Sequence, residues 1–300
     1  MFTKHITRVS EWIIERFIKI SGILGIVLVL LIFFFLLQNA LPMFGARTIS
    51  EVLTGTRWSP THGEGHFGML PLILGSLYVT AGALALSIPL GLATAIFIAE
   101  IAPRRVREVL KPMVEMLAAI PSVVFGFIGM TIVGPWIAAN FDAVPVGQFA
   151  ALGSLMLAFM ALPTIVSICE DAFHNVPREI FNSSLALGAT RWQTITRALL
   201  PAARSGIIAA FLLGLGRAIG ETMTVLMVTG NAQVMPEGLE GFLWPIRTMT
   251  ATIAAEMGET PHGSTHFHAL FTIGLILFVI TFAVNTIADV IIRRSEKDIA

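Results

Sequence analysis

Long apolar runs separated by short polar connections dominate this chain of 300 residues. A helix needs about 20 predominantly apolar residues to cross the hydrocarbon core of a bilayer. Runs of that length occur at residues 20–41, 69–99, 116–141, 143–169, about 205–231 and 269–288. The pattern therefore predicts an all-α polytopic membrane protein with six transmembrane helices.

Three prolines lie inside the predicted spans, namely Pro89, Pro121 and Pro163. Neighbouring helices can satisfy the carbonyl groups that a proline leaves unpaired in a membrane bundle. We therefore expect these prolines to kink their helices rather than to end them. The first run is also too long for the apolar core of a secretion signal, which spans about 7–15 residues. It is interpreted as a retained first helix.

The composition supports placement in lipid. Hydrophobic residues make up 55% of the chain and charged residues only 13%, whereas a soluble domain carries about 25% charged residues. The 19 basic and 19 acidic residues balance, which excludes a strongly basic nucleic-acid-binding protein. A chain of this composition is expected to work within the membrane.

Sorted by position, the charges predict the orientation. Fifteen of the 19 basic residues lie in the N-terminal segment, the 100–112 and 170–204 connections and the C-terminal segment. The connections on the opposite side contain only Arg47, Arg57 and Arg247. Because basic residues collect in cytoplasmic loops, both termini are predicted to be cytoplasmic.

Sequence motifs for catalysis and for cofactor binding are missing. No lysine follows a glycine, so the chain has no P-loop for nucleotide phosphates. Cys169 is the single cysteine, and we expect no metal site, although His262, His266 and His268 are close together in an external connection. The soluble connections are too short for a catalytic domain. These features predict a transport subunit that binds no cofactor of its own.

The connection at 170–204 is predicted to form two short helices around a glycine turn. Pro177 suits a first helical position, Gly188 suits a left-handed helix end, and Thr190 with Gln193 fits a capping box. Ile180, Ser184 and Leu187 share one face of the first helix, and Trp192, Ile195 and Leu199 line the apolar side of the second. The hairpin is either a plain link between spans or a docking surface for a partner groove.

Arg217 and Glu221 are two charges inside the fifth apolar run. Their i,i+4 spacing predicts an ion pair on one helix face. Such a pair either locks helices in register or marks a pathway, and intramembrane charges favour the pathway. The guanidinium can bind a tetrahedral oxyanion through two donors. The carboxylate can moderate that charge or accept a hydrogen bond from a protonated anion, which would favour phosphate. Arg247 either lies where the anion enters or pairs with Glu240.

The 170–204 connection resembles the cytoplasmic loop of ABC importer permeases. It matches that pattern at Gly188 and at Leu200-Pro201, but Asn182, Ser183 and Ser184 replace Glu-Ala-Ala, and Ala198 replaces isoleucine. In that family the loop contacts the ATPase subunit. The resemblance therefore implies that the following residues couple the chain to an ATPase: Ser184, Leu187, Gly188, Ala189, Thr190, Leu200 and Pro201.

Three further segments resemble phosphate importer permeases, and the sequence is more similar to the PstC than to the PstA subunit. These segments are "GRAIGETMTVLMVTGN", "LKPMVEMLAAIPSVVFGFIGM" at 110–130 and "WPIRTMTATIAAEMGE" at 244–259. The resemblance implies a type I ABC importer permease, with residues 1–68 as an N-terminal part and 69–300 as a core of five helices. By position it also makes Arg217 and Glu221 pathway residues.

The resemblance further implies the partners and the location. It predicts a PstA-like second permease, two PstB-like ATPase subunits that bind ATP and Mg²⁺, and a periplasmic PstS-like phosphate-binding protein, all at the bacterial inner membrane. Three alternatives remain open: a PstA-type partner permease, a permease for another oxyanion, and an ion-coupled secondary anion transporter.

Overall fold

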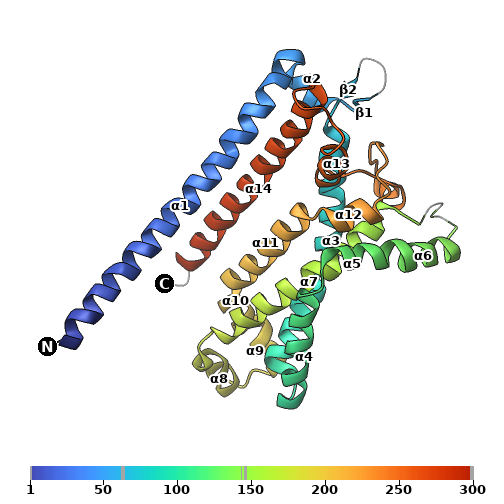
Figure 1. Cartoon of the computed structure of the whole chain (residues 1–300). Coiled ribbons are helices and arrows are strands. Elements are labelled where there is room, and N and C mark those ends of the chain that lie inside the picture. Colours follow the sequence, from blue (N-terminus) through green and yellow to red (C-terminus); the bar gives the residue numbers. More distant parts are fainter. Residues whose placement is uncertain (1, 62–64, 143, 145–146, 298–300) are drawn as a thin grey trace.

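A computed structural model of the chain describes residues 2–61, 65–142, 144 and 147–297 (Figure 1). Side chains at 2–11, 13 and 293–297 are outside this description. The charged groups predicted to orient the two ends of the chain are therefore partly outside this description, namely those of Lys4, Arg8, Arg293, Arg294 and Lys297.

Helices make up 79% of the structure. The α-helices are α1 (Phe2–Ala46), α2 (Ile49–Thr54), α3 (Leu70–Ile96), α4 (Arg104–Ala118), α5 (Ser122–Ile128), α6 (Gly134–Asn140), α7 (Ala150–His174), α8 (Arg178–Ala186), α9 (Arg191–Thr194), α10 (Leu200–Ala202), α11 (Arg204–Gly220), α12 (Met223–Val228), α13 (Met249–Glu256) and α14 (Thr265–Lys297). Short π-helical turns η1 (Phe97–Ile101), η2 (Gly129–Val133) and η3 (Ile195–Leu199) and the 3-10 turn η4 (Leu239–Leu243) join them. Strands β1 (Trp58–Ser59) and β2 (His66–Phe67) pair antiparallel.

Five stretches of helix within the described residues are long and apolar enough to cross a membrane: Ile14–Ala46, Leu70–Ile101, Ser122–Asn140, Ala150–His174 and Thr265–Ile292. A bent pair, Arg191–Ala202 and Arg204–Gly220 with a 73° angle between its parts, takes the place of the fifth span in chain order and brings the number to six if it counts as one span. At about 1.5 Å per residue, α11 is about 26 Å long, slightly short of a bilayer core of about 30 Å. The all-α polytopic prediction is confirmed, with the fifth span broken.

Two of the predicted spans have wrong boundaries. The third span begins at Ser122 rather than at 116, because Pro121 has an extended backbone (φ −60°, ψ 141°) and caps a new helix. Pro121 therefore separates two helices, whereas Pro89 and Pro163 lie inside α3 and α7 as predicted. The fourth span begins at Ala150 and continues to His174, five residues beyond the predicted end at 169.

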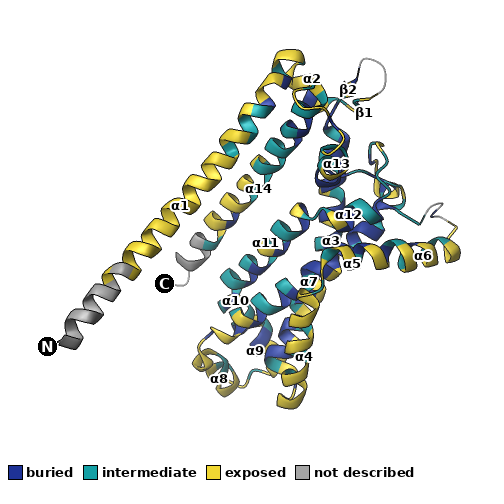
Figure 2. Cartoon of the chain, viewed as in Figure 1, coloured by how far each residue is buried: buried dark blue, intermediate teal, exposed yellow. Residues whose placement is uncertain are grey.

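The packed centre of the molecule is the contact between α3 and α7 (Figure 2). Small residues on α3 allow a close approach. A Cβ atom added to Gly82 would lie 2.4 Å from Ser154 Oγ, and one added to Gly91 would lie 2.7 Å from Ile165 Cγ2. Without a hydrophobic force between helices in lipid, such close packing of small residues is a main source of association.

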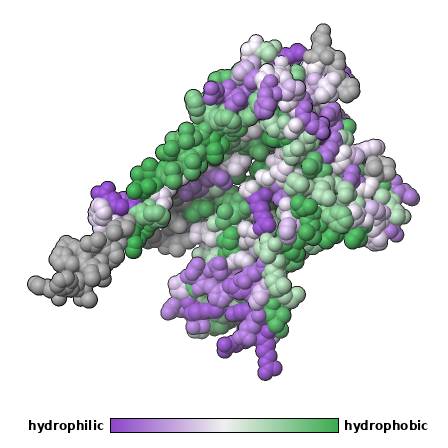
Figure 3. All heavy atoms as spheres, in the orientation of Figure 1, coloured by the Kyte–Doolittle hydropathy of each residue, from purple (hydrophilic) through white to green (hydrophobic). Residues whose placement is uncertain are grey.

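The two ends of the molecule are polar, and the middle is apolar. Figure 1 places α2, β1 and β2 at one end and α4, α8 and α9 at the other. Hydrophilic residues collect at both ends in Figure 3, while the surface of α1 between them is hydrophobic. Helices α1 and α14, the first and last of the chain, lie side by side along one flank of the bundle.

The connection at 232–268 folds back onto the bundle instead of staying outside it. A bridge between Gly230 and Ile246 holds its base, and α13 packs against α3, α12 and α14. Its residues Met249, Thr250, Ala251 and Thr252 are buried. This connection therefore contributes to the interior, which the sequence did not indicate.

The close approach of α3 to the Arg247 backbone gives a prediction for packing. A Cβ on Gly75 would lie 2.2 Å from the Arg247 carbonyl oxygen, so Gly75→Val should destabilise the protein by roughly 1–3 kcal/mol through overpacking. Gly22→Val on α1 is the matched control, since no atom lies within 4 Å of its Cβ position. We expect a lower midpoint of thermal unfolding in detergent for the first variant only; equal midpoints would contradict the packing.

Candidate functional site

The fifth span is interrupted in the middle. Helix α11 ends at Gly220, Glu221 is extended (φ −68°, ψ 132°), and α12 starts at Met223. The prediction of one continuous helix over 205–231 is wrong. The break is held by side-chain hydrogen bonds: the Thr250 hydroxyl donates to the Glu221 carbonyl oxygen (2.7 Å), and the Thr224 N–H donates to Glu221 Oε1 (3.1 Å).

The predicted ion pair between Arg217 and Glu221 is not formed. The helix ends between the two residues, so the i,i+4 geometry is lost and the carboxylate turns to the amide of Thr224. Arg217 instead reaches α7, where its Nη1 donates to Thr164 Oγ1 at 3.1 Å. It lies in the last turn of α11, where the helix dipole favours a cation.

The face of α11 beside Arg217 is open. Cβ atoms added to Gly216 and Gly220 would meet no atom of this chain within 4 Å. Small residues at this spacing permit a close approach of another backbone. Since this face has no packing partner in the described chain, it can face a pathway or a second subunit.

The coupling segment, residues 178–201, largely has the predicted form. The Thr190–Gln193 capping box is present, Gly188 has a positive φ of 84°, and Ser184 Oγ lies 3.0 Å from Thr194 Oγ1. Leu187 is 89% exposed at the turn. This tip presents apolar surface away from the bundle.

Two details of the coupling segment differ from the prediction. Ile195 and Leu199 are buried as expected, but Trp192 is 62% exposed. The reason is that α9 is a single turn, Arg191–Thr194, and Trp192 lies at its outer end, before the chain enters the core. Pro177 is the N-cap of α8 and not its first helical residue. Leu200 and Pro201 begin α10, directly before the bend into α11.

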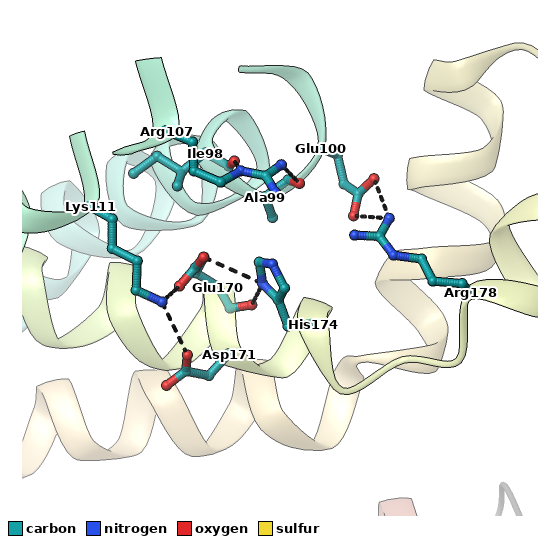
Figure 4. Close-up of polar contacts among 9 residues, drawn as sticks. All are labelled: Ile98, Ala99, Glu100, Arg107, Lys111, Glu170, Asp171, His174 and Arg178. Atoms are coloured by element: carbon teal, nitrogen blue, oxygen red, sulfur yellow. Dashed lines mark hydrogen bonds and ion pairs between the residues drawn. The ribbon is translucent and has the colours of Figure 1, made fainter. Parts of the chain in front are cut away.

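Two buried carboxylates tie the coupling end together (Figure 4). Glu170 on α7 has a side chain only 3% exposed and pairs with Lys111 of α4; His174 Nδ1 lies 3.4 Å from its Oε1. Glu100 in η1, 6% exposed, pairs with Arg178 at the start of α8 at 3.4 Å. The first pair joins α4 to α7, and the second joins the coupling segment to the end of the second span.

The 100–112 segment is therefore more than a surface patch of basic residues. It contains the start of α4, whose inward face carries Arg107 and Lys111. Arg107 donates to the carbonyl oxygens of Ile98 and Ala99, where η1 ends. The hydrogen bond to Glu170 raises the pKa of Lys111 above its ordinary value. The contribution of this pair to stability is therefore fully present below the pKa of an unfolded lysine, about 10.4. It is lost as the pH rises through the higher pKa that Lys111 has in the folded protein.

Arg247 does not pair with Glu240. Its Nη1 lies 2.5 Å from Glu256 Oε1 on α13, and both side chains are mostly buried. Glu256 also accepts hydrogen bonds from the Trp58 indole (3.2 Å) and contacts His266 Nε2 (2.8 Å). This cluster links the connection between α1 and α3 to α13 and α14, and the Arg247 charge is balanced by a carboxylate.

Sequence comparison identifies the family. Residues 87–300 match the model of the binding-protein-dependent transport system inner membrane component. The chain belongs to this family. It is 44% identical to the probable ABC transporter permease protein YqgH of Bacillus subtilis over 77% of this chain and 74% of that protein. It is 34% identical to the phosphate transport system permease protein PstC of Mesorhizobium japonicum, over 86% and 81%.

Solved structures agree on the fold. An inward-facing MetNI methionine ABC transporter chain matches with a TM-score of 0.59 at 18% identity, covering 76% of this chain and 97% of that one. A chain of a bacterial alginate ABC importer matches with a TM-score of 0.56 at 15% identity, covering 75% and 79%. The fold is therefore that of ABC importer permeases.

The buried carboxylate of Glu170 gives a prediction for stability. Lys111→Met leaves this carboxylate without its ammonium partner and should cost roughly 1–3 kcal/mol. Glu170→Gln should cost less, because the Lys111 side chain is 41% exposed and water can solvate it. The double variant Lys111→Met/Glu170→Gln should recover part of the loss. The check is the thermal unfolding midpoint of the three purified variants; a greater loss for Glu170→Gln would contradict this account.

Proposed function

We propose that this chain is a PstC-type permease subunit of an ATP-driven inorganic phosphate importer and forms half of the translocation pathway. The observation that carries the proposal is Arg217, a guanidinium inside the bundle at a break in the fifth span, with no carboxylate paired to it among the described residues. An intramembrane cation of this kind marks a substrate path. The similarity to PstC relatives supports phosphate as the anion.

The pathway residues are Arg217 and Glu221, with Arg247 as a weaker candidate. Arg217 supplies bidentate donors for a tetrahedral oxyanion. Glu221 lies at the break directly after α11, where its carboxylate keeps anion binding weak enough for release. A carboxylate also accepts a hydrogen bond from a protonated anion, which favours phosphate over sulfate. Arg247, balanced by Glu256, contributes less positive potential than a free arginine would.

The partners and the orientation belong to the same proposal. A PstA-like permease covers the open face of α11, two PstB-like ATPases bind ATP and Mg²⁺, and a periplasmic PstS-like protein delivers phosphate at the end that carries β1 and β2. Both termini are cytoplasmic, and the complex lies in the bacterial inner membrane. The family argues against an ion-coupled secondary transporter, while a PstA-type role or another oxyanion remains the nearest alternative.

Uptake by the reconstituted complex tests the substrate. Proteoliposomes with the complete complex, ATP and phosphate-loaded binding protein should accumulate radiolabelled phosphate. Arg217→Gln should abolish uptake without changing the amount of assembled complex, because the anion loses its donors. Wild-type uptake of sulfate but not phosphate would contradict the proposed substrate, and normal uptake by Arg217→Gln would reduce the residue to scaffolding.

The coupling role of the α8–α9 turn has a matched test. Gly188 (φ +84°) and Gly263 (φ +77°) both have open surroundings within this chain, so valine strains the backbone similarly at either site, by about 1–2 kcal/mol. Only Gly188 lies on the proposed ATPase-docking surface. Gly188→Val should lower ATP-driven uptake about fivefold or more, whereas Gly263→Val should stay within about twofold of the wild type. Equal effects would contradict docking at Gly188.

A further inference from the structure

A hydroxyl group, and not a carboxylate, holds the side chain of Arg217. Its Nη1 donates a hydrogen bond to Thr164 Oγ1 on α7 at 3.1 Å, and the described residues give the guanidinium no second polar contact. Arg247 is held differently, because its partner is the carboxylate of Glu256. A carboxylate balances the charge of the cation that it binds, whereas a hydroxyl accepts the hydrogen bond as a neutral group. Arg217 therefore keeps its whole positive charge.

The backbones on either side of this hydrogen bond are positioned by close packing of α11 against α7. A Cβ atom added to Gly214, three residues before Arg217, would lie 2.8 Å from Ile165 Cγ1. Ile165 follows Thr164 directly and is fully buried. Packing thus sets the spacing of the two helices, and the hydrogen bond adds the orientation of the Arg217 side chain.

The hydroxyl of Thr164 behaves unlike those of other threonines in the helices of this chain. Thr94, Thr272 and Thr281 each donate to the carbonyl oxygen of the residue four positions earlier, which is a usual state of a threonine in an apolar helix. For Thr164 the described residues show no such local bond, and its hydroxyl contacts Arg217 on the neighbouring helix instead. The position of this hydroxyl therefore serves the arginine and not its own helix.

The contact with Thr164 leaves one complete edge of the guanidinium available. Nε–H and one Nη2–H point in parallel along that edge, and Nη1 is not part of it. Two parallel donors bind two oxygens of one anionic group. Arg217 itself is only half-buried, and Cβ atoms on Gly216 and Gly220 would meet no atom of this chain within 4 Å. This part of α11 is therefore accessible to an anion while Nη1 stays on Thr164.

Building on the proposed import function, we propose that Thr164 is a positioning residue for Arg217, whose guanidinium it orients toward a tetrahedral oxyanion without cancelling the positive charge. A free arginine side chain has many rotamers, and fixing them when the anion binds costs conformational entropy. Thr164 fixes one nitrogen in advance, so this cost is smaller at the moment of binding.

Four substitutions of Thr164 separate orientation from charge. The assay is uptake by proteoliposomes that contain the complete complex, ATP and binding protein loaded with radiolabelled phosphate. Thr164→Val removes the acceptor and should lower the initial rate about tenfold, the effect of one lost hydrogen bond to a charged group. Thr164→Ser and Thr164→Asn keep a neutral oxygen acceptor, so both should stay within about threefold of the wild type. Thr164→Asp holds Arg217 but balances its charge, and it should abolish uptake by the assembled complex.

Thr281→Val on α14 is the matched control. Thr281 is also half-buried, and its hydroxyl donates at 2.8 Å to the Leu277 carbonyl oxygen of its own helix, so this variant should take up phosphate at the wild-type rate. Thermal unfolding midpoints of the assembled complexes show whether packing has changed. Thr164→Asp should be at least as stable as Thr164→Val, because its carboxylate can pair with Arg217.

The outcomes distinguish orientation of the anion site from a purely structural contact between helices. Normal uptake by Thr164→Asp would overturn the proposal, as would a wild-type rate for Thr164→Val or a Thr164→Ser variant as impaired as Thr164→Val. Uptake of sulfate instead of phosphate by the wild-type complex would refute the proposed substrate alone, and the same variants then test Thr164 with radiolabelled sulfate. A wild-type complex that transports neither anion would overturn both proposals.

Discussion

The need to satisfy backbone polar groups inside the bundle determines the shape of the central site. The hydrocarbon core contains no water, so the backbone N–H and C=O groups at the end of a helix there must form hydrogen bonds with other groups of the protein. At Glu221 these partners are the hydroxyl of Thr250 and the residue's own side chain, which binds the Thr224 amide. The folding back of α13 is therefore required by the break, and the two features position Arg217 and Glu221 apart from each other.

Electrostatic contacts have a different role at the coupling end. Glu170 and Glu100 are carboxylates buried at the ends of spans, and each is held by a cation from another element. A buried charge is strongly destabilising when its partner is removed. The relative positions of α4, α7 and α8 are consequently fixed by ion pairs, because separating either pair leaves a buried carboxylate without its cation. These pairs therefore tie α8 to the end of the second span and α4 to the fourth.

Local sequence signals predicted local structure well. The apolar runs located most spans, and the Thr190–Gln193 capping box and Gly188 lie as expected, because each depends on residues within one or two turns. The break at Glu221 was not predictable in this way, since Thr250, which stabilises it, is 29 residues away. The partners Lys111 and Glu170 are 59 residues apart.

The position of α1 beside α14 determines which substitutions this helix tolerates. Most of α1 faces outward along its whole apolar length, and the family match begins only at residue 87. The outward face of this helix therefore has to be soluble in lipid, and its other face has to pack against α14. Many apolar side chains satisfy the first demand, so exchanges among apolar residues on the outward face should be tolerated better than changes around Arg217.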